Sequence, residues 1–193
     1  MPSYWKFLLF IAATAWPCFS SAQDGTLYKE PPPPDAAFLR WVDPSPAPIV
    51  LGLAGIDSEG AAYRAISASE IVGLSEGHFY TAGRAADGEV VIIEEPARLD
   101  RSKVYVTVVN LSQSARQLEL ARDGRRVIGA TQTNSAKTRA VNPVTVALNV
   151  VGGAGSNAGT FQITLGRGQN VTFVARPDGV VMLQDRFGSN LEK

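Results

Sequence analysis

The chain has 193 residues, its 18 basic and 18 acidic side chains cancel, and it contains one cysteine, Cys18. Because that cysteine lies in an N-terminal leader, the mature chain has no disulfide, no thiol nucleophile and no thiolate metal site. The length suits one large domain or two small ones. Beyond the leader no apolar run is long enough to span a bilayer, so we expect no membrane insertion.

The first 22 residues predict a signal peptide. Lys6 provides the positive start, residues 7–16 form an apolar stretch, and small residues precede the expected cleavage before Gln23. An uncleaved membrane anchor is the alternative, but the apolar stretch is short and is closed by Pro17. We therefore expect a periplasmic protein.

Residues 23–36 predict a proline-rich arm, because four consecutive prolines favour an extended polyproline II segment. From there on, short apolar runs alternate with Gly, Pro, Asn and Asp, which is typical of strands joined by turns. One stretch, 65–74, is compatible with a short helix. The run 104–109 shows the alternation of a half-buried strand. The predicted strands are 37–42, 49–53, 63–67, 78–82, 89–94, 104–109, 117–121, 126–128, 144–151, 160–165, 171–175 and 180–184.

One sequence pattern occurs twice. Two pairs of residues in the first copy recur 91 positions later: Tyr80-Thr81 and Asp87-Gly88 correspond to Val171-Thr172 and Asp178-Gly179. The Asp-Gly pairs predict tight hairpin turns. The starts of the two copies also correspond, since 42–54 matches 109–121 with an offset of 67. We therefore predict an all-β fold of two tandem antiparallel β-sandwich domains, residues 37–97 and 98–193. A duplicated β domain favours binding over catalysis.

Charge is distributed unevenly between the halves. Residues 23–97 carry 4 basic and 12 acidic side chains, a net of −8, whereas 98–193 carry 13 basic and 6 acidic ones, a net of +7. Either the two faces hold the halves side by side, or the basic half is offered to an acidic partner or polyanion. The candidate partner- or polymer-binding residues cluster near one turn, although a solvated basic loop would look the same. They are Arg122, Arg125, Arg126, Lys137 and Arg139.

The sequence predicts no catalytic residue. His78 is the only histidine, and a hydrolytic triad needs a nucleophile, a base and an orienting group. The Gly-Asp-Ser block of exported serine esterases is absent, and Ser75 stands where their Asp would precede the histidine. His78 also corresponds to Gln169 in the second copy. We therefore interpret it as a structural or surface residue.

No cofactor, metal or nucleic-acid partner is predicted either. One histidine without cysteines gives no spaced set of metal ligands. The glycine-rich stretch 152–159 lacks the Lys and Ser or Thr that make a phosphate-binding loop. The adjacent Glu94 and Glu95 would point to opposite faces of a strand, which disfavours a carboxylate pair for glycoside hydrolysis.

Several blocks, taken in order, resemble the AlgF family of periplasmic alginate O-acetylation proteins. These blocks are 24–28, 37–40, 94–96, 110–112 with Leu118, Leu120 and 123–124, then Arg139 with 142–144, and finally 165–168. The resemblance implies two β-sandwich domains that work beside a membrane-bound O-acyltransferase and SGNH-type acetyltransferases. The family has no established catalytic residues to transfer to this chain.

The expected function is therefore that of a non-enzymatic adaptor for O-acetylation of an exopolysaccharide. The expected polymer is alginate or a related one such as cellulose. The sequence does not single out alginate, because the run 31–34 and the insertion 152–159 depart from the family pattern. A stand-alone polysaccharide-binding module is the main alternative. An enzyme with an unusual site is a third.

Overall fold

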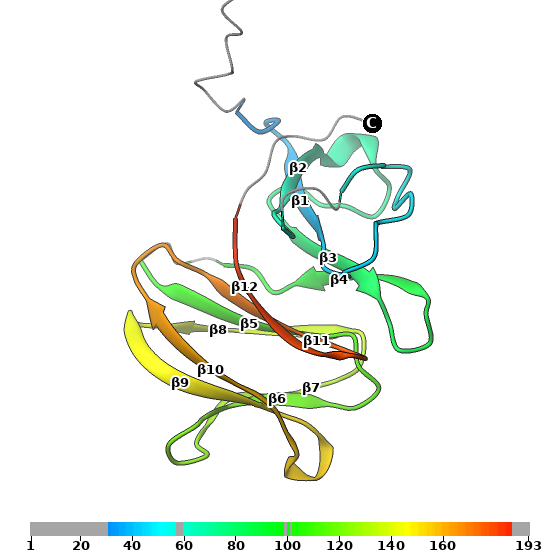
Figure 1. Ribbon diagram of the computed structural model, residues 1–193. Coiled ribbons are helices and arrows are strands. Elements are labelled where there is room, and N and C mark those ends of the chain that lie inside the picture. The colour runs from blue at the N-terminus through cyan, green and yellow to red at the C-terminus, as the bar shows by residue number, and fades with distance from the viewer. Residues whose placement is uncertain (1–30, 57–59, 99, 101, 187–193) are drawn as a thin grey trace, which may run out of the picture.

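The computed structural model describes residues 31–56, 60–98, 100 and 102–186. Over these residues the fold is built from three four-stranded sheets, and the predicted all-β class is confirmed (Figure 1). The helical content is two three-residue 3-10 turns, η1 (Ala68–Glu70) and η2 (Gly153–Gly155). Neither these nor any other described segment forms a helix that would cross a bilayer. The predicted signal peptide lies outside the described residues.

The N-terminal sheet has the order β2-β1-β3-β4, with β1 (Ala36–Trp41), β2 (Arg64–Ser67), β3 (Phe79–Arg84) and β4 (Val90–Glu95). The inner sheet of the C-terminal half has the order β12-β11-β5-β8, with β5 (Val104–Asn110), β8 (Ser135–Val141), β11 (Val171–Arg176) and β12 (Gly179–Gln184). The outer sheet has the order β10-β9-β6-β7, with β6 (Arg116–Leu120), β7 (Arg126–Thr131), β9 (Val144–Val151) and β10 (Asn157–Leu165).

The N-terminal sheet and the inner sheet share one topology. In each, the first strand runs parallel to the first strand of a hairpin, β1 beside β3 and β5 beside β11. The hairpins β3–β4 and β11–β12 contain the two Asp-Gly turns of the repeated pattern. Thr81 lies opposite Arg40, as Thr172 lies opposite Thr107. The duplication seen in the sequence is therefore confirmed as a duplicated sheet.

The second copy differs from the first by four inserted strands. β6 and β7 lie between β5 and β8 in the chain, and β9 and β10 lie between β8 and β11. Together they form the outer sheet, which packs on the inner sheet as a sandwich. The N-terminal half has a single sheet over its described residues, so the predicted first sandwich is corrected to one sheet covered by loops. Both parallel pairs also depart from the predicted antiparallel pairing.

Two local predictions in the N-terminal half were wrong. The run 49–53 forms an isolated bridge between Val50 and Leu53 and no strand. Pro44, Pro46 and Pro48 precede this bridge, and proline has no amide hydrogen to donate to a strand ladder. The stretch 65–74 is divided between the end of β2 and η1, so the predicted helix is limited to one short turn.

The inner sheet is the central layer of the molecule, between the N-terminal sheet and the outer sheet (Figure 1). Every residue of β5 is buried, which overturns the half-buried strand expected there. The N-terminal sheet covers the face of β5 that alternation had assigned to solvent. At this junction Gly83 allows close approach, because a Cβ there would lie 2.7 Å from Leu111 Cδ1. The shared apolar cluster consists of Val42, Ile93, Val109, Leu111 and Val174.

A buried network of charges joins the two halves beside this cluster. Arg40 has no exposed surface, and its Nη2 lies 2.9 Å from Glu95 Oε1 while its Nη1 lies 2.8 Å from Asp185 Oδ1. Its Nε and Nη2 also donate to the hydroxyls of Thr81 and Thr172, at 2.8 and 2.9 Å. The two equivalent threonines of the duplicated sheets therefore accept hydrogen bonds from the same guanidinium.

Arg98 completes the network from the connecting segment. Its Nη2 donates to Glu95 Oε2 at 2.7 Å, and its Nη1 lies 2.6 Å from Asp185 Oδ2 in an ion pair outside hydrogen-bonding geometry. Burial raises the pKa of Tyr63 well above 10.0, so its hydroxyl stays neutral and donates to Glu95 at 2.7 Å. Each half contributes one arginine and one carboxylate. The charges at this junction are therefore balanced, which differs from the alternative of an acidic face held against a basic one, and the domain boundary between residues 97 and 98 stays a prediction.

Candidate functional site: a basic hollow in the C-terminal sandwich

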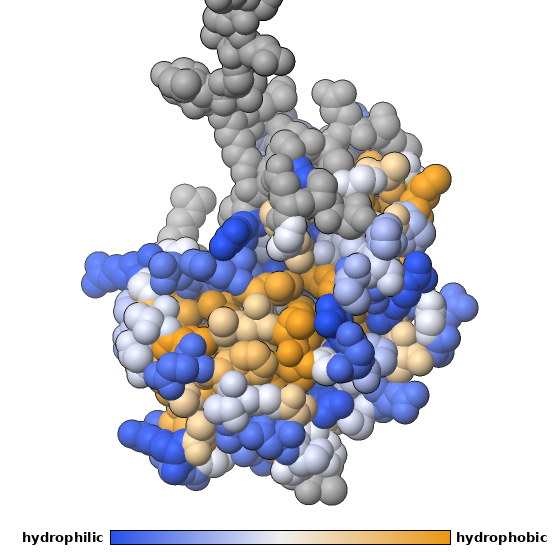
Figure 2. Space-filling model, viewed as in Figure 1, coloured by the Kyte–Doolittle hydropathy of each residue, from blue (hydrophilic) through white to orange (hydrophobic). Residues whose placement is uncertain are grey.

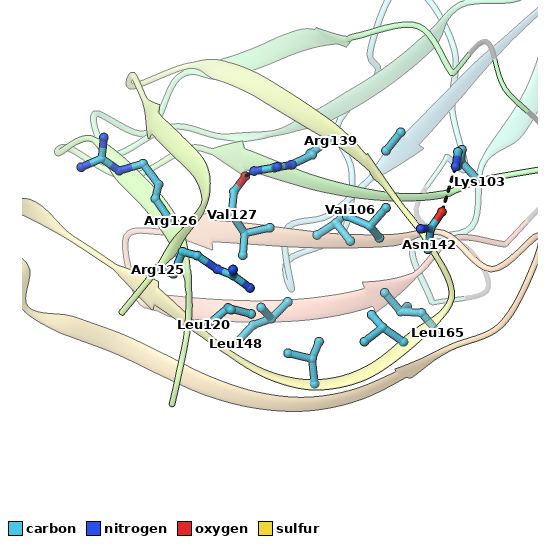
Figure 3. A pocket seen from close by; sticks show the side chains of 14 residues that line it. Lys103, Val106, Leu120, Arg125, Arg126, Val127, Arg139, Asn142, Leu148 and Leu165 are labelled. Carbon is cyan, nitrogen blue, oxygen red and sulfur yellow. Dashed lines mark hydrogen bonds between the residues drawn. The ribbon is translucent and has the colours of Figure 1, made fainter. Parts of the chain in front are cut away.

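A hollow of about 530 Å³ opens in the C-terminal sandwich between the β6–β7 hairpin, β8 and the start of β9 (Figure 3). Its wall includes residues of the sandwich core, since Val106, Leu148 and Leu165 line it although each is at most 4% exposed. Val144, at the mouth, is 43% exposed. The hollow therefore reaches the apolar core, which is left partly uncovered where β7 and β8 diverge.

Basic side chains surround this apolar wall. Lys103, Arg125, Arg126 and Arg139 all line the hollow, and no lining residue is acidic. Arg125 extends over the hollow toward Leu120 and Leu148, whereas Arg126 points away from it (Figure 3). Over the part of the chain that the structure describes, none of the four basic side chains forms an ion pair. The hollow therefore combines an apolar wall with a basic rim, and the nearest acidic side chains, Asp123 beside Arg125 and Glu119 opposite Arg126, lie outside its lining.

Two of the basic residues predicted from the sequence close one side of the sandwich. Lys137 and Arg139 lie on β8 opposite Val108 and Val106 of β5, so they share the inward face of the sheet with these valines. Lys137 Nζ donates to the Ala130 carbonyl at 2.5 Å, and Arg139 Nη1 donates to the Val127 carbonyl at 2.8 Å. These bonds satisfy carbonyls of the edge strand β7. Inward-pointing charges of this kind also discourage edge-to-edge pairing.

The predicted basic residues do not all lie at one place. The structure brings Arg125, Arg126 and Arg139 together at the hollow. Arg122 lines a neighbouring hollow of about 350 Å³ and pairs with Asp123 at 3.0 Å. Lys137 lines neither hollow. The loop expected around Lys137 and Arg139 was wrong, because the polar stretch 135–141 forms β8.

Sequence reasoning missed the remaining parts of the hollow. Lys103 reaches it from the segment before β5, and its Nζ donates to Asn142 Oδ1 at 2.8 Å. The apolar wall was assigned wholly to the core. A usable signal was present, because Leu120, Arg139 and residues 142–144 belong to the blocks that carry the family resemblance and lie together here.

The hollow also borders an incomplete strand edge. β9 pairs with β10 along its whole length, but its pairing with β6 ends at the Leu120–Leu148 pair. One further backbone bond, from Ala121 N to Ala147 O at 2.9 Å, follows before the chain turns at Gly124, whose φ is +68°. Residues 144–146 of β9 thus have no described strand partner on the side of the hollow.

His78 is an exposed residue of the N-terminal half. Its Nδ1 lies 2.7 Å from Glu94 Oε1, and both side chains are about half exposed, at 45% and 55%. A carboxylate beside imidazole is the base-and-orienter part of a triad. In the described chain, however, no Ser or Thr hydroxyl makes a hydrogen bond with the ring. No group of three or more His, Cys, Asp or Glu suited to a metal gathers among the described residues.

A second apolar area lies over the C-terminal sandwich between hydrophilic margins (Figure 2). A shallow hollow of about 200 Å³ on the side of the edge strands β10 and β12 is lined by Ile163, Leu165 and Met182 together with Gln162, Gln169 and Gln184. It has no charged lining residue. This area therefore offers less chemical selectivity than the basic hollow.

Comparison with known proteins agrees with the sequence resemblance. The sequence model of the family described as Alginate O-acetyl transferase AlgF matches residues 58–172, more than half of the chain. Alginate biosynthesis protein AlgF of Azotobacter vinelandii is 25% identical over 167 residues, which cover 78% of this chain and 77% of that protein. The protein of the same name from Pseudomonas syringae pv. tomato is 30% identical over 103 residues, 53% of this chain and 46% of that one.

Among solved structures, the C-terminal domain of AlgF from P. aeruginosa aligns at 29% identity with a TM-score of 0.38, covering 43% of this chain and 98% of that domain. The range 58–172 contains every lining residue of the basic hollow, including Arg125, Arg126 and Arg139, and stops short of β12. The resemblance inferred from the sequence is thereby confirmed, and the chain belongs to the AlgF family.

Proposed function

We propose that this protein acts in the O-acetylation of an exported polysaccharide, alginate or a related polymer such as cellulose, as a non-catalytic periplasmic adaptor. Membership of the AlgF family is the observation that carries the proposal, since the relatives are named alginate biosynthesis proteins. The partners we expect are SGNH-type acetyltransferases of the periplasm and a membrane-bound O-acyltransferase.

The word transferase in the family description leaves a catalytic role as the competing hypothesis. The one imidazole of the chain favours the adaptor, because its described contact is with exposed Glu94 and it lies just before β3 of the N-terminal sheet, whereas the basic hollow lies in the C-terminal sandwich. The chemistry of the hollow also favours binding, since guanidinium groups without a described ion-pair partner around aliphatic side chains suit recognition of an anionic, partly apolar surface.

The junction between the halves supports a positioning role. The apolar cluster and the four buried charges join the N-terminal sheet to the inner sheet, so that surfaces on both halves are held in one arrangement. An adaptor needs such rigidity, because its contribution is the relative placement of its partners.

The test is the acetyl content of the secreted polymer in strains that carry the deleted gene, the wild-type gene or His78→Ala. We expect deletion to abolish acetylation and His78→Ala to preserve it, because no described hydroxyl depends on that imidazole. Glu94→Gln serves as the matched variant of the same pair. Loss of acetylation in His78→Ala, with folding and abundance unchanged, would make the protein an enzyme. Normal acetylation after deletion would favour a stand-alone polysaccharide-binding module.

A further inference from the structure

The basic hollow carries charge that the described protein does not use. In the junction, each arginine faces carboxylates at 2.6 to 2.9 Å. At the hollow, Arg125 forms no described ion pair, although its charge interacts with that of nearby Asp123, and the Arg139 guanidinium contacts a single backbone carbonyl. Positive charge that lies beside a low-dielectric apolar wall is attracted to anionic groups more strongly than the same charge in open solvent. The rim of this hollow therefore favours an anionic group.

The wall decides which kind of anion fits. All its large side chains are aliphatic, and no lining residue is aromatic. A sugar chain would place hydroxyl groups against Val106, Val146 and Leu148, and these aliphatic side chains cannot replace the hydrogen bonds that the hydroxyls make with water. An aliphatic or aromatic side chain of a protein is stabilised when it leaves water and packs against the same residues. A volume of about 530 Å³ admits such side chains.

The strand edge indicates the conformation of the occupant. Residues 144–146 of β9 offer backbone groups without a strand partner beside the mouth of the hollow. An extended segment can pair with such an edge, and its alternate side chains then enter the adjoining pocket. Lys103 lies at one end of the hollow and Arg125 at the other, so the parts of such a segment that extend beyond the paired residues would pass these two cations.

We propose that the hollow binds an extended acidic segment of a protein partner, with an apolar side chain inserted against the wall beside Leu148 and carboxylates against Arg125 and Arg139. This proposal deepens the adaptor function, on which it rests, by naming the chemistry of the segment that the adaptor captures. The hollow is then the docking site for a protein, and polysaccharide is handled by the partner.

The first experiment identifies the occupant in the cell. The photo-crosslinking residue p-benzoylphenylalanine replaces Val144, which is 43% exposed at the mouth, in the full-length protein expressed in its own host. The control places the same residue at Met182, which is 39% exposed on β12. After irradiation the crosslinked peptide is sequenced by mass spectrometry. We expect a crosslink from position 144, and none from 182, to a segment with a large apolar residue flanked by Asp or Glu.

Three other results at position 144 would overturn the proposal. They are a crosslink to polysaccharide alone, a crosslink to a second copy of this chain, and no crosslink beyond that of the control position. A captured protein segment that lacks acidic residues would overturn it as well.

The second experiment measures how much the basic side chains and the apolar wall each contribute to the affinity for the segment. A labelled synthetic peptide with the crosslinked sequence is titrated with the purified mature protein by fluorescence anisotropy. We expect Arg125→Glu to weaken binding at least about tenfold, and Arg167→Glu, the same charge change at an exposed turn outside the hollow, to change it by less than about twofold. A peptide whose apolar residue is replaced by Ser should also bind at least about tenfold more weakly. Equal effects of Arg125→Glu and Arg167→Glu would sink the proposal.

The two levels of the hypothesis fail separately. If deletion of the gene abolishes acetylation but the peptide does not bind, the adaptor function stands and the hollow is not its docking site. If deletion leaves acetylation normal, the adaptor function fails whatever the hollow binds.

Discussion

The molecule uses arginine in two opposite ways. At the junction, Arg40 and Arg98 are buried against two carboxylates, two threonine hydroxyls and Tyr63. At the basic hollow, Arg125 and Arg126 are exposed and form no described ion pair, although Asp123 and Glu119 lie near them. The junction therefore satisfies its charge within the protein, and the hollow leaves its charge for something else. The same residue type contributes to stability in one region and is free for binding in the other.

This difference makes mutational effects on folding and on binding separable. Removal of one junction arginine leaves two buried carboxylates with a single counter-charge, which is costly. Removal of a hollow arginine leaves no buried charge, and Arg139 alone loses a described hydrogen bond, to the Val127 carbonyl. Four measurements of stability test the contrast, from the largest expected effect to the smallest.

Arg40→Ala should lower the free energy of unfolding by about 3–5 kcal/mol, because Glu95 and Asp185 stay buried with Arg98 as their one remaining counter-charge. Urea denaturation followed by circular dichroism measures the change. Arg167→Ala, an exposed arginine outside the network, is the control and should stay within about 0.5 kcal/mol of wild type. A small effect at Arg40 would mean that the network is relaxed or hydrated in solution.

Acid should weaken the same network by protonating its carboxylates. Burial alone would raise the pKa of Glu95, but the guanidinium groups of Arg40 and Arg98 outweigh it and hold this pKa below 4.5. A lowered folded pKa contributes stability above the unfolded value, and this stability is lost as the pH falls. We expect the urea midpoint to decrease as the pH falls below 4.5 and on through the lower folded pKa.

The control for this acid effect is Glu95→Gln, which cannot titrate at that position. This variant should be less stable than wild type at pH 7 and should show a shallower loss of stability on acidification. Asp35, whose pKa is about 2 because of hydrogen bonds from Ser69 and Ser67, keeps its own contribution in both proteins. Parallel pH profiles for the two proteins would contradict the assignment to Glu95.

Gly83→Val should destabilise the junction through packing alone. Even a Cβ at Gly83 would meet Leu111 Cδ1 at 2.7 Å and Val42 Cγ2 at 3.1 Å, and valine adds two methyl groups. Overpacking of this kind costs about 1–3 kcal/mol. Gly129→Ala is the control, because a Cβ there would make an ordinary contact of 3.8 Å. The midpoint of thermal unfolding reports both changes, and an unshifted midpoint for Gly83→Val would show that the sheets can separate freely.

The smallest effects on stability are expected at the hollow. Arg139→Ala removes a hydrogen bond to the Val127 carbonyl and should cost about 0.5–1.5 kcal/mol. Arg125→Ala removes no described side-chain bond and should stay within about 0.5 kcal/mol of wild type. Measured together by urea denaturation, the two variants rank the rim residues by their structural role. A loss at Arg125 as large as that at Arg40 would erase the contrast between the two regions.

The sequence was sufficient to predict the features that depend on local pattern. The alternation of apolar and turn residues gave the strand class, and the recurrence of the Asp-Gly hairpins gave the duplication, which the shared topology confirms. It could not distinguish one sheet from a sandwich in the N-terminal half. That distinction depends on whether the residues between the strands form a second sheet. Prolines 44, 46 and 48 disfavour such strand pairing there.

The two arginine sites were predictable to different degrees. Clustering in sequence brought attention to Arg125 and Arg126, but the apolar wall of the hollow arises from strands far apart in the chain. The junction was missed because Arg40 and Asp185 are distant in sequence. A signal existed in the placement of a single charged residue within the apolar run 37–42 and in the correspondence of Thr81 with Thr172. Burial of β5 on both faces required knowledge of how the sheets stack.

The central position of the inner sheet has a consequence for the order of folding. β5 pairs in parallel with β11, and the chain between them must form β8 and the whole outer sheet. During synthesis from the N-terminus the N-terminal sheet can assemble early, while β5 must wait for β11. Asp185, just after β12, is the last member of the junction network in chain order. The network is therefore completed only after β12 has been made, and a truncation that removes Asp185 would leave Arg40 and Arg98 without one of their two carboxylates.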